Sequence, residues 1–328
     1  MRGGMRGDQE ERFESDVATS LSNQLWCRCT RAPIRGNSRA VAAKNAAGGE
    51  NMKVLEAQFA KDFIKCGTDG FKQGWHERNG GNLSYRMTAE DVKAVEENFS
   101  EDRDLLPIGA CVPGLAGEYF AVTGTGRYMR NLELDPEQSF GIIHVDEKGE
   151  NYRIVWGLKD SRPTSELPTH LMNHEVKKRV TGGKHRVIYH AHPTNLIALT
   201  FILPLESEVF TRELWEMMTE CPVIFPEGIG VVPWMVPGGR QIAVETSKLM
   251  EEYNAVVWSM HGLFCSGSTF DEVFGLMHTI DKASEIWLKV ASVTGGKKRQ
   301  TITPDNFRAL AKDFHVTLDE RFLYRKEN

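Results

Sequence analysis

The segment HRVIYHAHPTNLIALT, residues 185–200, carries two histidines one residue apart inside an apolar run. The β-branched and aromatic residues at 187–189 predict a buried strand. Successive side chains on a strand point to opposite faces, so His190 and His192 share a face, roughly 6 to 7 Å apart along it. Two imidazoles aimed at one spot are typical of a metal site, although a histidine pair on an exposed edge strand has the same pattern.

The composition of the chain indicates a globular protein with a small ligand. Of its 328 residues, 41% are hydrophobic and 26% are charged, and the formal net charge is -5. Such a charge offers no electrostatic surface for a nucleic acid or an anionic membrane. No run approaches the roughly 18 to 20 apolar residues of a membrane span, and the N-terminus lacks the apolar region of a secretory signal. We therefore expect a soluble, cytoplasmic protein that binds a small molecule.

Residues 1–51 differ in character from the rest of the chain. They are rich in charged residues, glycine and alanine, and they have almost no spaced apolar residues. Such a segment cannot offset the entropy of ordering, so we predict a disordered N-terminal extension. From Leu55 onward apolar residues recur at helical spacing, and residues 52–328 are predicted to form one domain.

The pattern over residues 52–328 predicts an α/β domain with a central, mainly antiparallel β-sheet flanked by helices. A hydroxyl N-cap at Thr164 or Ser165 predicts the start of one helix, with Glu166 in its first turn. Thr269 and Glu272 are predicted to form a capping box for a later helix. The other expected elements are helices at 55–75, 210–220 and 240–253, a strand at 118–123, a hairpin at 140–157, the strand at 187–192 and a strand at 255–261 that ends in His261.

A third histidine extends the metal hypothesis. Catalytic zinc sites commonly use three protein ligands and leave one position open, and His261 is the candidate third ligand. The six cysteines form no Cys-x-x-Cys pair, which argues against disulfides and against a thiolate zinc site. We assign His144, in the hairpin, and His174, within a helix, to structural hydrogen bonding.

Three segments have the features of a phosphate site, which needs accessible backbone N–H groups or hydroxyls at a helix N-terminus. They are the glycine-rich turns at 79–82 and 123–126 and the hydroxyl pair at 164–165. Each segment alone fits an ordinary turn or cap equally well. Glu166 alone is also ambiguous, because an acidic residue in a first helical turn complements the helix dipole.

The order of several longer motifs along the chain decides between these alternatives. The chain resembles the class II aldolase and adducin family over residues 52–328, and the motifs that carry the resemblance are GWHERNGGNLS, AVTGTG, GLKDSRPTSELPTH, HAHPTNLIALT, FTRELWE, TECPVIFPEGIGVVPWMVPG and HGLFCSG with DEVFGL. Thr125 stands where the family form TGSG has serine, and it keeps a hydroxyl. Ala191 and Pro193 differ from the family form HCHATN and change neither histidine.

The resemblance implies a fold, a reaction and a set of roles. The implied fold is a central, mainly antiparallel sheet flanked by helices, in a homotetramer with active sites near subunit interfaces. The implied reaction, part of L-rhamnose catabolism, is zinc-dependent retro-aldol cleavage of L-rhamnulose 1-phosphate to dihydroxyacetone phosphate and L-lactaldehyde. The implied roles are zinc ligation by His190, His192 and His261, acid/base catalysis by Glu166, a second carboxylate at Glu220, and phosphate or substrate binding by Asn79, Gly81, Asn82, Thr125, Thr164 and Ser165.

Two other functions fit parts of the same pattern. An epimerase of the family would use the same zinc to break and remake a carbon–carbon bond of a pentose phosphate, which the match over the whole domain disfavours. A non-enzymatic, adducin-like interaction module would keep the fold alone, and the presence of three histidines and Glu166 argues against it. Whether Glu220 acts in its own subunit or in a neighbouring one stays open at this stage.

Overall fold

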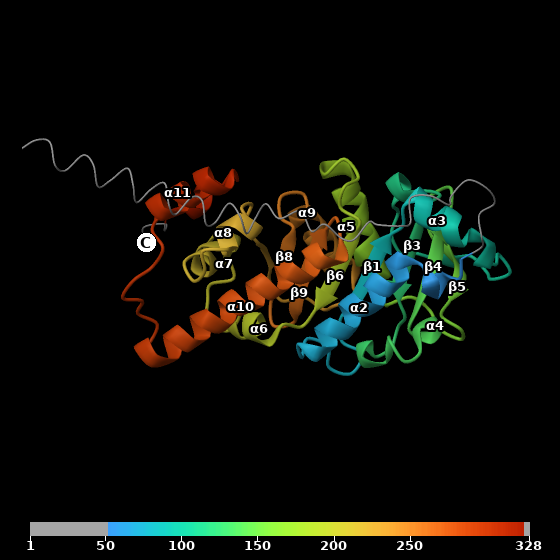
Figure 1. Cartoon of the computed structure of the whole chain (residues 1–328), viewed down its shortest axis with the longest axis horizontal. Helices are drawn as coiled ribbons and strands as arrows, with labels where there is room; N and C mark the ends of the chain where they lie inside the picture. The colour runs from blue at the N-terminus through green and yellow to red at the C-terminus, as the bar shows by residue number, and fades with distance from the viewer. Residues whose placement is uncertain (1–51, 325–328) are drawn as a thin grey trace, which may run out of the picture. The chain divides into compact units, whose positions relative to one another are not determined.

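A nine-stranded sheet organises residues 52–324, the part of the chain that the computed structural model describes (Figure 1). The extension predicted at 1–51 lies outside these residues and stays a prediction. In chain order the strands are β1 (Asn82–Arg86), β2 (Leu106–Pro107), β3 (Tyr119–Thr123), β4 (Phe140–Val145), β5 (Asn151–Gly157), β6 (Val187–Ala191), β7 (Gly230–Val232), β8 (Ala255–Trp258) and β9 (Gly262–Gly267).

The sheet is almost wholly antiparallel. Its spatial order is β2–β5–β4–β3–β1–β6–β9–β8–β7, and the parallel neighbours are β7 and β8 at one edge. Every residue of the central strands β1, β6 and β9 is buried, so both faces of the sheet are covered there. This arrangement confirms the predicted fold class.

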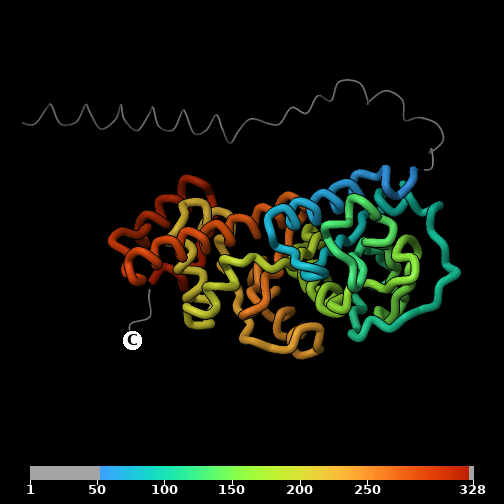
Figure 2. Tube along the Cα trace, turned by 90° about the horizontal axis from the view of Figure 1, so that it is seen from below, coloured from blue at the N-terminus to red at the C-terminus, as the bar shows by residue number. Residues whose placement is uncertain are grey.

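Helices cover both faces of the central strands. They are α2 (Gln58–Lys72), α3 (Ala89–Val95), α4 (Pro136–Ser139), α5 (Leu167–Val180), α6 (Thr194–Leu199), α7 (Ser207–Trp215), α8 (Cys221–Ile224), α9 (Arg240–Leu249), α10 (Phe270–Thr294) and α11 (Pro304–Phe314). Helices α2 and α10 contact each other and run along the same side of the molecule (Figure 2). Tyr189 faces this side, where a Cβ on Gly70 of α2 would collide with its hydroxyl. His190, the next residue, therefore faces the opposite side, where α5 and α9 pack together.

Three local predictions need correction. Helix α5 begins at Leu167 with Glu166 at its N-cap, one or two residues later than predicted. The Thr164 hydroxyl accepts from the Glu166 N–H (3.3 Å), so it closes the turn before the helix and does not cap it. Strand β8 ends at Trp258, and His261 lies in the turn between β8 and β9.

Only half of the predicted capping box of α10 forms. Thr269 accepts from the Glu272 N–H, whereas the Glu272 carboxylate accepts from the Ser268 N–H (2.7 Å). Helix α11 was not predicted, although its Thr303 and Asn306 do form a capping box. Among residues 52–324, no helix combines the length and apolar character that crossing a bilayer requires.

Candidate active site

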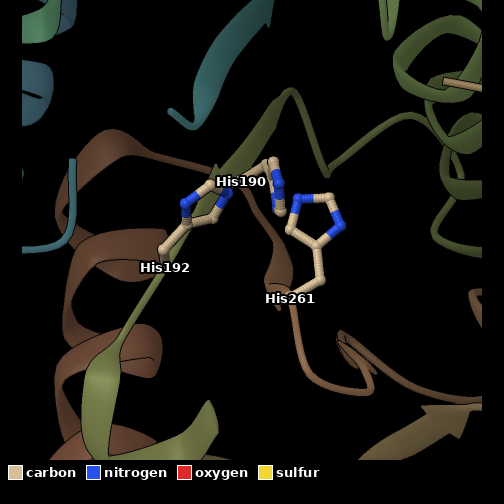
Figure 3. Close-up of side chains that lie close together, drawn as sticks. All are labelled: His190, His192 and His261. Carbon is tan, nitrogen blue, oxygen red and sulfur yellow. The ribbon is translucent and has the colours of Figure 1, made fainter. Parts of the chain in front are cut away.

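Three imidazoles converge where β6 and the β8–β9 turn meet (Figure 3). His190 is in β6, His192 follows its last residue, and His261 precedes β9. The ring centroids of His190 lie 5.1 Å from those of His192 and His261, and the other two centroids are 4.9 Å apart. One nitrogen from each ring lies within 4.8 Å of the other two, which is the arrangement of a three-histidine metal site.

Hydrogen bonds fix the orientation of two of these rings. His190 donates its Nδ1–H to the carbonyl oxygen of Leu263 (3.1 Å), and His192 donates its Nδ1–H to Glu77 Oε1 (2.7 Å). The Nε2 atoms of both histidines are buried and have no hydrogen-bond partner among residues 52–324. Unpartnered Nε2 atoms with Nδ1 held by a carbonyl or carboxylate are what a bound metal ion requires. The residues present therefore fit a divalent cation.

The surroundings favour the neutral form of His190 and His261 and pack the His190 ring tightly. Burial and the neighbouring histidines hold the pKa of His190 well below its ordinary value, and burial lowers the pKa of His261 to about 4. Neutral imidazole is the form that binds metal. His190 stacks on Phe264, with ring centroids 4.2 Å apart. A Cβ on Gly262 would collide with the Ala191 carbonyl and crowd the His190 and His192 rings, so glycine is required beside the ligands.

Glu166 lies next to the histidines. It is 7% exposed, and its Oε2 is 3.7 Å from His190 Nε2. Asn82 donates its side-chain amide to the same oxygen (2.8 Å). Burial raises the pKa of the Glu166 carboxyl, and the Asn82 hydrogen bond opposes part of that rise. A raised pKa makes the carboxylate a stronger base and leaves more of the carboxyl protonated at a given pH.

The histidines and Glu166 line a pocket of about 220 Å³ together with all six predicted phosphate- or substrate-binding residues. The predicted residues that line it are Asn79, Gly81, Asn82, Thr125, Thr164 and Ser165, and its other lining residues are Gly80, Gly124, Gly126, Pro237 and Gly238. The position of these residues shows that three segments distant in sequence meet at one pocket.

Backbone hydrogen bonds join two of the glycine- and hydroxyl-rich segments. Thr164 N–H donates to the Thr123 carbonyl, and Thr125 N–H donates to the Arg162 carbonyl (2.8 Å each). In the third segment, Gly81 has a φ of +74°, and a Cβ there would collide with His76 and the His190 carbonyl. The pocket wall on these sides is therefore backbone and hydroxyl, the groups that bind phosphate.

Glu220 is the one predicted site residue that the structure places elsewhere. It is exposed at the N-cap of α8 and does not line the pocket of its own chain. His144 and His174 also lie outside the pocket. His174 is hydrogen-bonded to Ser84 Oγ (2.8 Å), as predicted, whereas His144 stacks on Tyr119 (4.3 Å between centroids).

Glu77 is a site residue that sequence reasoning missed. Its carboxylate holds His192, but the two residues are 115 positions apart. Its only sequence signal is its place in the GWHERNGGNLS motif, two residues before the predicted turn at 79–82.

Known proteins share both the sequence and the fold. The model of the class II aldolase and adducin N-terminal domain matches residues 61–288. A rhamnulose-1-phosphate aldolase of Mannheimia succiniciproducens is 47% identical over 267 residues, 81% of this chain and 97% of that protein. One of Pectobacterium atrosepticum is 48% identical, over 80% of this chain and 96% of that protein. The crystal structure of a sugar-phosphate aldolase of Thermotoga maritima is 28% identical, with a TM-score of 0.63, over 72% of this chain and 96% of that one.

Proposed function

Because the chain belongs to the class II aldolase and adducin family, we propose that it cleaves L-rhamnulose 1-phosphate to dihydroxyacetone phosphate and L-lactaldehyde. Its relatives at 47% and 48% identity are named for this substrate and match over nearly their whole length. The chain is thus a lyase of the aldolase type, in a pathway of L-rhamnose breakdown. The observation that carries the proposal is the buried Glu166 carboxyl, 3.7 Å from His190 in the pocket with the histidine triad.

The chemistry requires stabilisation of negative charge. Cleavage of the C3–C4 bond of a ketose leaves the electron pair on C3, delocalised onto the C2 oxygen as an enediolate. A divalent cation held by His190, His192 and His261, which we propose is zinc, supplies Lewis-acid stabilisation of that charge. Imidazole ligands carry no negative charge, so a cation held by these three residues would keep its full charge.

Glu166 moves the proton at C3. In the cleavage direction its carboxyl returns a proton to C3 of the enediolate, and in the synthetic direction the carboxylate removes one. Asn82 holds Oε2, and Oε1 makes no hydrogen bond to any of residues 52–324, which leaves that oxygen to exchange the proton. The raised pKa of the buried carboxyl favours the protonated form that the cleavage direction uses.

The phosphate group of the substrate is proposed to lie against the wall of glycine and hydroxyl groups. Asn79, Gly81, Thr125, Thr164 and Ser165 all line the pocket. Backbone N–H groups and hydroxyls bind phosphate oxygens without adding a fixed charge next to the metal ligands.

The second carboxylate is proposed to come from another copy of the chain. Removal of the C4 hydroxyl proton needs an acceptor, and Glu220 is the expected one. Because Glu220 is exposed and outside the pocket of its own chain, it would reach the site of a neighbouring subunit in a homotetramer. We place this assembly in the cytoplasm.

Hybrid oligomers test the shared site. Glu166→Gln and Glu220→Gln are each expected to remove most activity, and co-expressed chains are expected to recover about a quarter of it, because some sites then combine two intact carboxylates. Equal mixtures that stay as inactive as the single variants would place both carboxylates in one subunit.

Metal analysis and one assay test the function itself. The purified protein is expected to contain about one zinc ion per chain and to release dihydroxyacetone phosphate from L-rhamnulose 1-phosphate. Bound metal with pentose phosphate interconversion and no cleavage would identify an epimerase instead. Absence of both metal and activity would indicate that the protein is a non-enzymatic interaction module.

A further inference from the structure

A line of buried polar side chains extends from Glu166 away from the pocket. Asn82 and Ser84 are two residues apart on β1 and therefore share a face of the sheet. His170 and His174 are four residues apart on α5 and share a face of the helix, on the same side as Glu166 at its N-cap. All five side chains are 7% exposed or less.

Each member of the line contacts the next. Asn82 Nδ2 is 2.8 Å from Glu166 Oε2, and Asn82 Oδ1 is hydrogen-bonded to His170 Nε2. On its other edge, His170 Nδ1 is 2.6 Å from Ser84 Oγ, which is 2.8 Å from His174 Nε2. The hydrogen bonds alternate between β1 and α5 and connect the carboxyl group to the second histidine.

The chemistry of the groups gives every hydrogen bond the same direction. A carboxylate can only accept, so Asn82 donates its NH₂ to Glu166 and presents its carbonyl to His170. His170 then donates from Nε2, and its Nδ1 is the acceptor that receives the Ser84 hydroxyl proton. Ser84 in turn accepts from His174 Nε2–H. His174 Nδ1 has no hydrogen-bond partner among residues 52–324, as expected for the unprotonated nitrogen of that tautomer.

Burial keeps both imidazoles in the neutral form that this direction requires. It lowers the pKa of His170 to about 3 and holds the pKa of His174 well below its ordinary value. A neutral His170 has one donor and one acceptor nitrogen, and the Ser84 hydroxyl determines which is which. The tautomer of His170 therefore sets which end of the Asn82 amide faces Glu166.

We propose that His170 is a positioning residue for catalysis, which holds the Asn82 amide so that its NH₂ group fixes Oε2 of Glu166 and leaves Oε1 toward the substrate. This inference rests on the proposed aldolase function. Without the His170 donor, the Asn82 amide is free to turn its carbonyl toward the carboxylate, where two acceptors repel. Small displacements of a reacting group lower rates by up to about 100-fold.

The inference gives Asn82 a task other than phosphate binding. Its carbonyl oxygen is taken by His170 and its NH₂ group by Glu166, so the side chain is committed to the carboxylate. Steady-state kinetics distinguishes phosphate binding by Asn82 from positioning of Glu166 by Asn82. Loss of a phosphate contact raises KM, whereas a misplaced proton-transfer group lowers kcat.

Three variants and one control test the proposal. His170→Leu removes both nitrogens from the buried site, His170→Gln keeps one donor and one acceptor, and Ser84→Ala removes only the hydroxyl that sets the tautomer. The control is His185→Leu, which breaks another histidine–serine contact, between His185 Nδ1 and Ser266 Oγ (3.0 Å), away from the pocket. For each purified protein we would measure bound zinc, KM and kcat for cleavage, and proton exchange of saturating dihydroxyacetone phosphate in heavy water.

His170→Leu is expected to lower kcat and the exchange rate together by about 10- to 100-fold, with KM and zinc content within about twofold of wild type. His170→Gln is expected to restore most of the loss, and Ser84→Ala to fall between the two. The control is expected to match wild type. If His170→Leu does not fold, kcat and the exchange rate still test the proposal. They are expected to be highest in wild type, slightly lower in His170→Gln and clearly lower in Ser84→Ala.

Two results would overturn the inference. One is kcat and exchange within twofold of wild type in His170→Leu and Ser84→Ala. The other is a raised KM with unchanged exchange at saturation, which would make Asn82 a phosphate ligand. A wild-type protein without cleavage or exchange would instead refute the proposed function, so the two failures are distinguishable.

Discussion

Asn82 and His190 are directly opposite each other in the antiparallel ladder between β1 and β6. One of them holds the Glu166 carboxylate, and the other is a metal-ligand candidate 3.7 Å from that carboxylate. Because strand register fixes both backbones, the sheet positions Asn82, which holds the Glu166 carboxylate at the N-cap of α5, directly opposite His190. This relationship ties the site to two neighbouring strands in which every residue is buried.

His192→Ala is expected to remove most bound zinc, because two remaining imidazoles rarely hold a catalytic ion. The fold is expected to persist, since His192 lies just after β6 and outside the ladder. Zinc per chain, measured after dialysis, together with circular dichroism, checks both statements. A variant with stoichiometric zinc and normal turnover would contradict the ligand assignment.

Glu77→Gln is expected to weaken zinc binding by about 10- to 100-fold, the usual cost of losing a carboxylate that orients a ligating histidine. Competition with a chelator gives the affinity. A matched control is Glu245→Gln, which removes a surface carboxylate paired with Lys248 and should leave zinc affinity unchanged. Equal affinities in all three proteins would show that the Glu77 contact does not orient His192.

The pH dependence of stability reports on His170. Its pKa is about 3 in the folded protein and about 6.5 in the unfolded chain, so between these values only the unfolded state binds the proton. Stability present above pH 6.5 is therefore lost as the pH falls, by up to about 1.4 kcal/mol per pH unit for this histidine. Urea unfolding between pH 4 and 7 is expected to show a correspondingly shallower dependence for His170→Gln. If the free energy of unfolding depends on pH equally in wild type and His170→Gln, His170 is not a buried neutral histidine in the folded protein.

Deletion of residues 1–51 is expected to leave cleavage and assembly unchanged, because the sequence there provides no periodic apolar face. Light scattering and the cleavage assay on chain 52–328 check this. Dissociation of the truncated protein, or loss of its activity, would give the extension a role that its composition does not suggest.

The parts of the site that follow from local periodicity were predictable from the sequence. The two-residue repeat of a strand predicted that His190 and His192 point to one place, and their ring centroids lie 5.1 Å apart, although β6 ends at Ala191. The motifs around Gly81 and Thr164 were also recognisable, and both segments line the pocket. These features depend on a few neighbouring residues, which one sequence records.

The features that depend on distant contacts were not predictable. Helix α5 buries polar side chains as well as leucines. Its His170 and His174 meet Ser84 of β1, and its Asn173 and Lys177 meet Ser247 and Asn254. The sequence therefore assigned His174 to an isolated structural role and gave no role to His170. The partnership of Glu77 with His192 and the position of Glu220 outside its own pocket also arise only in the folded chain.

Proton exchange by Glu166→Gln tests the central claim most directly, because the amide keeps the size of the side chain and removes only the proton-transfer group. Dihydroxyacetone phosphate incubated with the wild-type enzyme in heavy water is expected to exchange one hydroxymethyl proton stereospecifically, without any aldehyde present. The variant is expected to keep its zinc and to lose exchange and cleavage in parallel, by a factor on the order of 10² to 10⁴. A variant that holds zinc and exchanges the proton at the wild-type rate would contradict the account, and the base at C3 would have to be another residue.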